Sequence, residues 1–339
     1  MSNWYLQNGK ESDVAISTRV RLARNIEGFK FINKCNKEDK SKIVNKIEEI
    51  LPDIGYDLKL FKLKDMDNIT KKALVEKNVI SPEFSLKEGD EYAILINKEE
   101  NICIMINEED HLIIQVFSEG LEIETSLALA VELDNKIGKL IKYAYSDKYG
   151  YLTACPTNIG TAARISTMLH LPALTKTENV SKILMLASNF GINIRGSYGE
   201  GTESEGSVYQ ISNKQTLGVT EEDIAKSIKN VTEKIITQER AARTSLGKTG
   251  IKLENKLYRS FGILTCSKIL TSGECRKLLS DVKLGTDMGI IKELDDSKIK
   301  KLWLYTKSAN LQKYYGQTYN EEERSIKRAE LIKNIVYKA

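Results

Sequence analysis

A glycine-rich acidic segment, Arg195–Asn213 (RGSYGEGTESEGSVYQISN), constrains the fold of this chain most. Glycines stand at positions 196, 199, 201 and 206 among glutamates at 200, 203 and 205. Glycine adopts backbone conformations that other residues resist, and the alternating run Ser207–Ile211 that follows is typical of a strand. We therefore expect a loop of wide conformational freedom that returns to a rigid sheet. Such a loop is either a solvated acidic hairpin or a lid that carries a carboxylate to a reacting group.

The composition favours a soluble globular protein without a nucleic-acid or membrane partner. The chain has 339 residues, 41% of them apolar and 29% charged, which suggests two domains or one large one. The net charge of +4 is mild, and the two signs are interspersed. No apolar run is as long as a transmembrane helix, and the first residues do not resemble a signal peptide. We expect a cytoplasmic protein.

The cysteines and histidines argue against a metal or disulfide framework. The five cysteines are widely scattered, and no two form a CxxC pair. This pattern indicates reduced thiols in the cytoplasm. With only two histidines in the chain, a histidine-based metal site is not expected, and we predict no metal-binding residues.

Alternating hydrophobicity predicts a strand over Val14–Leu22, with Arg19 and Arg21 on the same face because side chains two apart in a strand point the same way. This pair is either a cationic patch or part of a solvated sheet face. Three further apolar runs predict strands: Tyr92–Ile96, Ile102–Ile106 and Leu112–Phe117. The acidic run Asn107–His111 lies at a hairpin tip between the last two, where adjacent carboxylates lie in water or face a cation.

Helical spacing occupies most of the remaining chain. Helices are predicted over Lys37–Leu51, Ile69–Val79, Leu121–Tyr145 and Glu178–Asn189. Thr220 and Asp223 resemble a capping box that opens a long helix to about Ser245. Ile251–Ala339 is almost entirely helical in period, with a further helix start at Thr271–Glu274. We therefore expect a first domain over residues 1–245 and a helical domain over residues 246–339.

The segment Tyr151–Arg164 (YLTACPTNIGTAAR) places Cys155 before a proline. A Thr-Asn-Ile-Gly turn follows, and we predict that it leads into a helix carrying Arg164. A cysteine beside a helix start is either a reactive thiol or a small buried residue.

Four blocks together resemble the phosphagen, or guanido, kinases. They are Ser17–Asn25 (STRVRLARN), Asn107–Leu112 (NEEDHL), Cys155–Thr161 (CPTNIGT) and Arg195–Gly206 (RGSYGEGTESEG). Their order agrees with the family, and the resemblance covers roughly residues 10–245. The first block begins at residue 17, without the long helical domain that precedes it in kinases of free creatine or arginine. This position, the RGSYGEG form and the ERAAR segment Glu239–Arg243 resemble the bacterial protein arginine kinases.

The resemblance implies an α/β (α+β) catalytic domain with a large, mostly antiparallel sheet flanked by helices, followed by a C-terminal helical domain. It also implies ATP-dependent phosphorylation of arginine side chains in proteins, a mark for Clp-type degradation and the stress response. The implied partners are protein substrates with exposed arginine, an activator protein and the Clp protease machinery. A homodimer is a further expectation from the family.

The resemblance also assigns roles to residues. Glu109 and Glu203 would grip the guanidinium, align it and accept a proton, with Cys155 beside it. Mg²⁺ would bridge the phosphate oxygens of ATP with few protein ligands. The implied ATP-binding residues are Ser17, Thr18, Arg19, Val20, Arg21, Arg164, Ile165, Ser166, Thr167, Met168, Arg195, Gly196, Ser197, Tyr198, Gly199 and Glu200.

Two positions depart from the family pattern. Ile113 stands where the family has a phosphate-binding arginine, so either another arginine compensates or the chain is a weakened homologue acting as a phosphoarginine-binding adaptor. A kinase of free arginine is the other alternative. In Arg324–Ala329 (RSIKRA), Ser325 replaces the aspartate of the branch's phosphoarginine-docking motif. On a helix Arg324 and Arg328 share one face, where they would clamp a phosphate or form a solvated basic surface.

Overall fold

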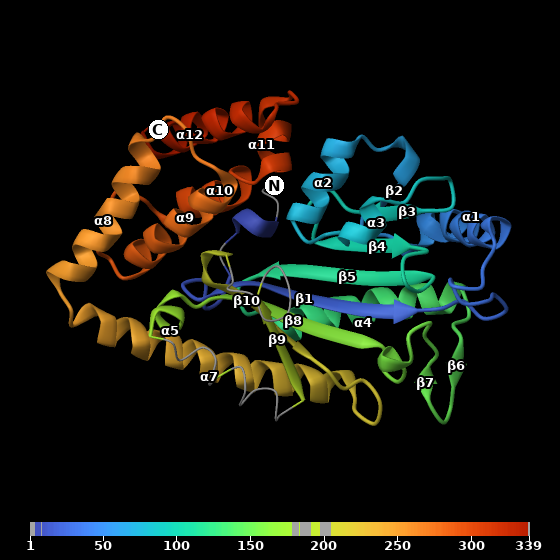
Figure 1. Cartoon of the computed structure of the whole chain (residues 1–339). Helices are drawn as coiled ribbons and strands as arrows, with labels where there is room; N and C mark the ends of the chain where they lie inside the picture. Colours follow the sequence, from blue (N-terminus) through green and yellow to red (C-terminus); the bar gives the residue numbers. More distant parts are fainter. Residues whose placement is uncertain (1–3, 8, 178–182, 184–190, 197–204, 338–339) are drawn as a thin grey trace. The chain divides into compact units, whose positions relative to one another are not determined.

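The computed structural model describes residues 4–7, 9–177, 183, 191–196 and 205–337 (Figure 1). The helix expected over residues 178–189 and the tip of the glycine-rich segment, residues 197–204, lie outside the described residues. The strands are β1 Ala15–Arg24, β2 Lys59–Lys62, β3 Ala93–Ile96, β4 Ile102–Ile106, β5 Leu112–Glu119, β6 Tyr145–Ser146, β7 Gly150–Tyr151, β8 Ala163–His170, β9 Ile192–Gly196 and β10 Val208–Asn213.

The described helices include those predicted over residues 37–51 and 69–79 and after Thr220 and Thr271, with shifted ends, and two short ones that were not predicted, α3 and α5. They are α1 Lys37–Ile54, α2 Asn68–Glu76, α3 Pro82–Ser85, α4 Ile123–Leu140, α5 Pro172–Lys176, α7 Glu221–Gly247, α8 Ile251–Cys266, α9 Ser272–Asp287, α10 Asp296–Tyr305, α11 Ser308–Tyr315 and α12 Glu321–Tyr337. Short 3-10 turns occur at η1 Trp4–Leu6, η2 Leu63–Asp65, η3 Pro156–Asn158 and η4 Glu205–Ser207.

Eight strands form one sheet in the order β2-β3-β4-β5-β1-β8-β10-β9. The pairs β2–β3, β3–β4, β4–β5 and β1–β5 are antiparallel. Sheet strands of this kind, flanked by helices and followed by a helical C-terminal region, confirm the predicted fold class. The short strands β6 and β7 form a separate hairpin.

The register of β1 on β5 decides which side chains share a face of the sheet. Arg21 lies opposite Gln115, and Ala23 lies opposite Ile113. An apolar cluster on this face joins η1, α2 and α3 to the sheet, and Ile113 belongs to it. Helix α4 packs against β5, and α1 packs against α4 (Figure 1). Arg21 therefore lies on the same sheet face as Ala23 and Ile113 of this apolar cluster.

One element differs in type from its prediction. Arg164 lies on strand β8 and not on a helix. The run Ala163–His170 is buried at six of its eight positions, so its polar alternation is weak. Periodicity alone does not separate such a short buried strand from a helix. Helix α4 also ends earlier than predicted, at Leu140, because Ile141 is already extended.

The predicted helix starts are confirmed. Thr220 and Asp223 exchange two hydrogen bonds of 3.1 Å, since each side chain accepts from the other's backbone N–H. Thr271 accepts from the Glu274 N–H at the start of α9. Such caps satisfy backbone donors that a helix start leaves without an internal partner.

Arg24 is a buried cation at the end of β1, with 1% of its surface exposed. Its guanidinium grips Asp134 of α4 through Nε and Nη2, with distances of 2.7 to 3.1 Å. Nη1 donates to the carbonyl of Thr161 at 3.0 Å. The ring of Tyr151 lies 3.5 Å from the guanidinium carbon. A buried charge is tolerated only with such complete pairing, so Arg24 fixes α4, the β6–β7 hairpin and the segment before β8 around itself.

The chain divides into two compact units that interleave along the sequence. The first comprises residues 1–10, 17–167 and 212–231, and the second comprises residues 11–16, 168–211 and 232–339. The predicted boundary at 245/246 stays a prediction, since the units change more than once along the chain. The C-terminal helices α8, α9, α10 and α12 share one apolar core.

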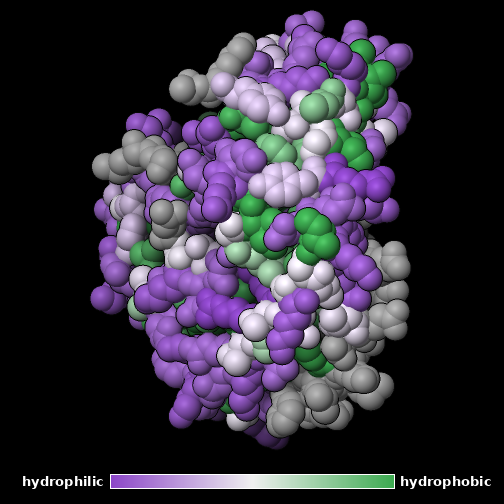
Figure 2. Space-filling model, turned by 90° about the vertical axis from the view of Figure 1, so that its left-hand side faces the viewer, coloured by the Kyte–Doolittle hydropathy of each residue, from purple (hydrophilic) through white to green (hydrophobic). Residues whose placement is uncertain are grey.

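On the face in view in Figure 2, hydrophilic residues dominate and hydrophobic ones form small groups. Within the part of the chain that the structure describes, no helix is both long and apolar enough to cross a membrane.

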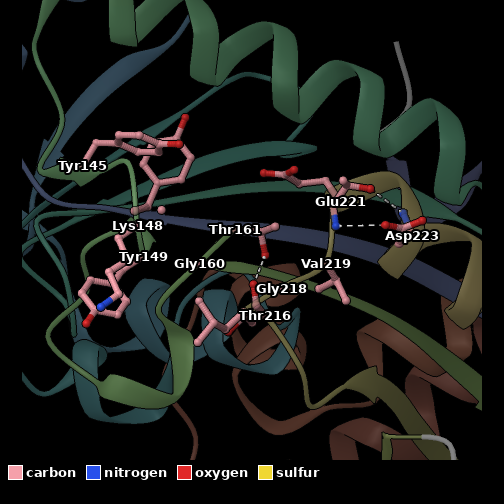
Figure 3. Close-up of a pocket in the computed structure, with 14 residues that line it drawn as sticks. Tyr145, Lys148, Tyr149, Gly160, Thr161, Thr216, Gly218, Val219, Glu221 and Asp223 are labelled. Carbon is pink, nitrogen blue, oxygen red and sulfur yellow. Dashed lines mark hydrogen bonds between the residues drawn. The ribbon is translucent and has the colours of Figure 1, made fainter.

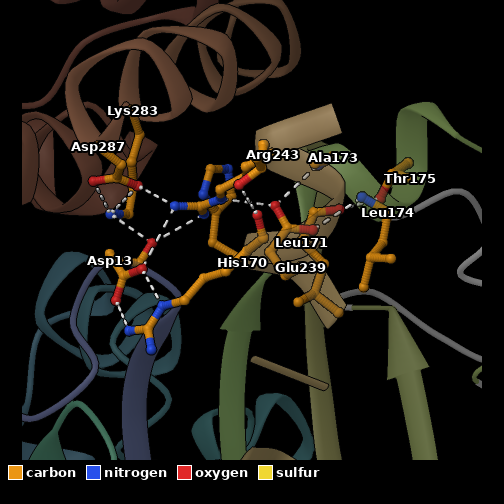
Figure 4. A network of polar contacts seen from close by, with 12 residues as sticks. Asp13, His170, Leu171, Ala173, Leu174, Thr175, Glu239, Arg243, Lys283 and Asp287 are labelled. Atoms are coloured by element: carbon orange, nitrogen blue, oxygen red, sulfur yellow. Dashed lines mark hydrogen bonds and ion pairs between the residues drawn. The ribbon is translucent and has the colours of Figure 1, made fainter. Parts of the chain in front are cut away.

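A polar network in the second unit anchors its N-terminal segment (Figure 4). Arg243 donates to Glu239 at 2.9 Å and to the Asp13 carbonyl at 3.0 Å. Asp287 lies 3.0 Å from Lys283 and 3.3 Å from Arg243. Burial raises the pKa of Asp287 to about 6, although both cations oppose the rise.

The ERAAR segment has a structural role. Besides its bond with Arg243, Glu239 accepts from the N–H groups of Ala173 and Leu174 in the first turn of α5.

His170 is fully buried beside this network, with Nε2 2.8 Å from Ser280 Oγ. Burial lowers the pKa of His170 well below its usual value, and the cations Lys283, Arg243 and Lys176 lower it further. Below about pH 6.5, His170 therefore binds a proton in the unfolded chain but stays neutral in the folded chain.

We predict that His170 costs stability in acid. Below about pH 6.5 its contribution should fall by about 1.4 kcal/mol per pH unit, and it should be constant above that pH. His170→Gln keeps a polar partner for Ser280 but cannot titrate. Urea unfolding of both proteins from pH 5 to pH 8 should give a wild-type-minus-variant difference that drops only in acid. Asp287 and the other acids titrate in both proteins and cancel. A difference independent of pH would contradict the assignment.

Candidate active site

Three arginines gather on one face of the sheet in the first unit. Burial lowers the pKa of Arg19 well below its usual value, and repulsion from Arg21 and Arg164 lowers it further. Arg19 and Arg21 come from β1, and Arg164 comes from β8. Guanidinium groups held this close concentrate positive potential, so the patch is complementary to a polyanion such as a triphosphate. The predicted cationic patch is thus not a row of fully solvated side chains.

Gln115 orients Arg21. Its Oε1 accepts from Arg21 Nε at 3.2 Å and from Nη2 at 3.1 Å. Its own Nε2 donates to the carbonyl of Val79 at 2.8 Å, so the amide is fixed from both ends. Burial lowers the pKa of Arg21, whereas Glu108 and Glu109 raise it. This orienting glutamine was not predicted. The one sequence signal for it is its position two residues after Ile113, which puts both side chains on the same face of the strand.

Ile113 lies on the same sheet face as Arg21, two residues before Gln115 on β5. It is opposite Ala23 on one side and Met105 on the other, and only 2% of it is exposed. The family's phosphate-binding arginine is therefore replaced by a side chain that is built into an apolar cluster.

Glu109 lies in the turn between β4 and β5, next to Glu108 and Asp110. Partial burial raises its pKa, the two neighbouring acids add to the rise, and Arg21 and Asn158 oppose it. A carboxylate with a raised pKa is a better proton acceptor near neutral pH. The acidic turn thus faces a cation, one of the two environments that the sequence allowed.

Cys155 directly precedes the 3-10 turn η3 and is half-buried, with Sγ 3.0 Å from Thr157 Oγ1. Asn158 of the same turn donates to Glu109 Oε2 at 3.4 Å. The structure thus brings the loop with Cys155 to the loop with Glu109. Asn158 was not singled out by sequence reasoning, although it lies inside the CPTNIGT block.

The remaining predicted ATP residues are distributed over both units. In the first unit, Ser17, Thr18 and Val20 lie on β1, while Ile165, Ser166 and Thr167 lie on β8. Ser166 Oγ donates to the Arg19 carbonyl at 3.5 Å. In the second unit, Met168 is a half-buried residue of β8, and Arg195 and Gly196 are the last residues of β9. Ser197, Tyr198, Gly199, Glu200 and Glu203 lie outside the described residues.

The two arginines of the RSIKRA segment differ sharply in environment. Arg328 is buried and donates to the carbonyls of Thr306 and Leu270, both at 2.7 Å. Arg324 is half-buried and donates to the Tyr319 carbonyl at 2.9 Å. Of the two alternatives, the solvated basic face does not hold for Arg328, whose guanidinium ties α12 to the ends of neighbouring helices.

A surface cavity of about 530 Å³ lies beside the end of the Cys155 loop (Figure 3). Tyrosines 145, 149 and 151, backbone of Gly160 and the first turn of α7 line it. Thr216 connects it to the loop, since its hydroxyl donates to the Thr157 and Ile159 carbonyls. As far as the chain is described, the lining includes none of the predicted site residues. Among the described residues of the chain, no group of three acidic, histidine or cysteine side chains could hold a metal ion.

Two family models match this chain, and together they leave out residues 1–39 and 243–249. A model described as ATP:guanido phosphotransferase, C-terminal catalytic domain, matches residues 40–242. A second, described as Protein-arginine kinase McsB C-terminal domain, matches residues 250–339.

Curated relatives extend over the same length. The protein-arginine kinase of Geobacillus sp. (strain WCH70) is 42% identical over 348 residues, covering 98% of this chain and 93% of the relative. That of Halothermothrix orenii is 43% identical over 335 residues, covering 98% and 96%. That of Bacillus subtilis (strain 168) is 40% identical over 347 residues, covering 98% and 93%.

Solved structures resemble the chain as well. The substrate-free duplicated taurocyamine kinase of Schistosoma mansoni has a TM-score of 0.59 and 29% identity over 70% of this chain. This chain spans 36% of that duplicated chain. Lombricine kinase has a TM-score of 0.61 and 23% identity, covering 72% of this chain and 70% of the other, which supports the fold alone.

We predict that Ile113→Arg will not restore the family's phosphate contact. The new cation would enter an apolar cluster beside Arg21, so the unfolding free energy should fall by about 3 kcal/mol or more. Ile113→Val, the conservative apolar control, should lose about 1 kcal/mol. Urea unfolding measures the first effect, and ATP titration calorimetry should show no gain in affinity. Tighter ATP binding with unchanged stability would show that position 113 still faces phosphate.

Proposed function

The chain belongs to the ATP:guanido phosphotransferase family, among its protein-arginine kinases, and we propose that the loops of Glu109 and Cys155 form its transfer site together with the arginines of β1 and β8. Its reaction is the ATP-dependent phosphorylation of arginine side chains in proteins. The observation that supports the proposed site is that Asn158 of the Cys155 turn donates to Glu109, whose carboxylate also interacts electrostatically with Arg21.

The geometry supports distinct tasks for the two halves of this site. Arg19, Arg21 and Arg164 would neutralise the charge of the ATP phosphates and of the transferring group. A guanidinium is always protonated in water, so it becomes a nucleophile only if a base removes a proton. Glu109, with its raised pKa, would accept that proton as the new N–P bond forms and the P–O bond to ADP breaks.

Glu203 and Cys155 complete the proposed constellation. Glu203 would hold the second edge of the guanidinium fork, opposite Glu109, because two carboxylates can align a planar donor bidentately. Cys155 would lie beside the guanidinium of the substrate, as the family pattern implies. Arg195, Gly196 and residues 197–200 would bind the ATP phosphates, as the family pattern implies.

Mg²⁺ fits this donor set as a companion of ATP and not as a resident ion. The described residues contain no three-ligand acidic site, and Mg²⁺ commonly keeps several waters while binding substrate phosphates. Bound in this way, it would offset phosphate charge during transfer.

The remaining expectations concern partners and location. We propose a cytoplasmic enzyme that acts on proteins with exposed arginine and supplies a mark for a Clp-type protease in the stress response. An activator protein and a homodimer belong to the same proposal. A non-catalytic phosphoarginine adaptor is the second candidate, and Ile113 is the observation that favours it. A kinase of free arginine is disfavoured, because residues 250–339 match a domain of protein-arginine kinases.

We predict that the protein phosphorylates an arginine-rich protein with ATP, giving acid-labile phosphoarginine detectable by mass spectrometry. Glu203→Gln should lower turnover by about 10² to 10⁴-fold, since glutamine keeps the size but cannot accept a proton. Glu205→Gln removes the same charge two residues away and is the matched control. Label on free arginine would favour the small-molecule kinase, and no label on any substrate would favour the adaptor. Equal turnover in the two variants would remove Glu203 from the proposed site.

Phosphoarginine docking at Arg324 and Arg328 is a further part of the proposal. Because Arg328→Ala would also break fold contacts, Arg324→Ala is the informative change, with Lys327→Ala as the neighbouring control. Calorimetry with phosphoarginine and saturating nucleotide should show a binding event that Arg324→Ala abolishes and Lys327→Ala keeps. ATP affinity should stay constant in both. Absence of the event in the wild type would leave α12 as a charged structural helix.

A further inference from the structure

Asn25, which directly follows the last residue of β1, contacts both loops of the proposed site. It is 1% exposed. Its Nδ2 donates to Asp110 Oδ1 at 2.6 Å and to the carbonyl of Leu152 at 3.0 Å. Its Oδ1 accepts from the His111 N–H at 3.0 Å. One amide side chain thus holds the turn that carries Glu109 and the start of the segment that carries Cys155.

Asp110 closes the same connection from the other side. Its Oδ1 also accepts from the backbone N–H of Ala154 at 2.6 Å. Asp110 directly follows Glu109, and Ala154 directly precedes Cys155. A single carboxylate oxygen therefore connects the immediate neighbours of the two proposed catalytic residues.

Burial makes this connection rigid. Asp110 and His111 have no exposed surface. Burial raises the pKa of Asp110, Glu108 raises it further, and the hydrogen bonds from Ala154 and Asn25 oppose the rise. A buried carboxylate that loses such donors is costly to keep, so separating the two loops would destabilise the fold.

Arg24 supports the far end of the same loop. It donates to the Thr161 carbonyl at 3.0 Å, at the end of the CPTNIGT block. Two consecutive residues after the arginine patch of β1 thus hold the beginning and the end of the Cys155 loop. His111 adds a brace, because its Nδ1 accepts from the Ile26 N–H at 2.9 Å.

We propose that Asn25 and Asp110 are positioning residues that set the distance between the Glu109 carboxylate and the Cys155 thiol around the substrate guanidinium. Neither touches the reacting atoms. The proposal rests on the proposed function for its catalytic consequence, whereas the clamp itself can be tested without activity. Misplacement of reacting groups by about 1 Å can cost about 10²-fold in rate.

The kinetic test compares Asn25→Ala, Asp110→Ala and Asp110→Asn in the full chain. The two alanine variants should lower kcat about 10²-fold while the KM for ATP stays within about twofold, because the arginine patch is retained. Asp110→Asn keeps one oxygen for Asn25 and Ala154 and should recover most of the loss.

A matched control separates positioning from stability. Asn97 is also a buried asparagine that bridges a turn, since it donates to Asn101 and accepts from the Ile102 N–H. Asn97→Ala should cost stability comparable to Asn25→Ala and leave kcat unchanged. If Asn97→Ala lowers kcat as much, the effect is general destabilisation and the proposal fails.

Hydrogen exchange of a peptide spanning residues 152–156 provides the second readout. Exchange at Ala154 should accelerate at least about tenfold in Asp110→Ala and remain slow in Asn97→Ala. Unchanged exchange would overturn the clamp, and faster exchange with normal kcat would overturn its role in positioning. A wild type without phosphoryl transfer would refute the proposed function instead, while exchange would still decide whether the clamp exists.

Discussion

The buried guanidinium of Arg24 is the interaction on which the first unit depends. A cation with 1% exposure is stable only if every donor finds an oxygen and the charge finds a counter-charge. Asp134 of α4 supplies the charge, Thr161 supplies a carbonyl, and Tyr151 covers the planar face. Because these partners come from three separate elements, satisfying one side chain fixes the place of a helix, a hairpin and the loop of Cys155.

The two ends of strand β1 have different roles. Arg19 and Arg21 alternate onto the face that gathers Arg164, so this part of the strand provides charge for a polyanion. Arg24 and the adjoining Asn25 turn inward and hold the loops that carry the proposed chemistry. The segment Arg19–Asn25 thus contains both the electrostatic surface of the site and the contacts that keep its geometry. One strand can serve both purposes because β1 lies between β5 and β8 in the sheet.

Local sequence patterns predicted the elements whose signals are local. The alternation around Arg19, the acidic hairpin tip at Glu109 and the capping box at Thr220 each depend on residues within one turn or strand, and the structure reproduces them. Arg164 was assigned to a helix because β8 is buried on both faces and loses its period. The burial of Arg328 depends on the carbonyls of Thr306 and Leu270, and no pattern within its own helix predicts those partners. The roles of Gln115 and Asn25 depend on long-range contacts of the same kind, so the sequence did not predict them.

The interleaving of the two units has a consequence for how the chain is made. Asp13 belongs to a unit whose other anchors, Arg243 and Lys283, lie 230 and 270 residues later. At a ribosomal rate of about 5–20 residues per second, the N-terminal segment emerges roughly 10 to 50 seconds before its partners exist. In a nascent chain, the segment around Asp13 therefore lacks its partners Arg243 and Lys283 through most of translation. A chain truncated before these residues would never form those contacts.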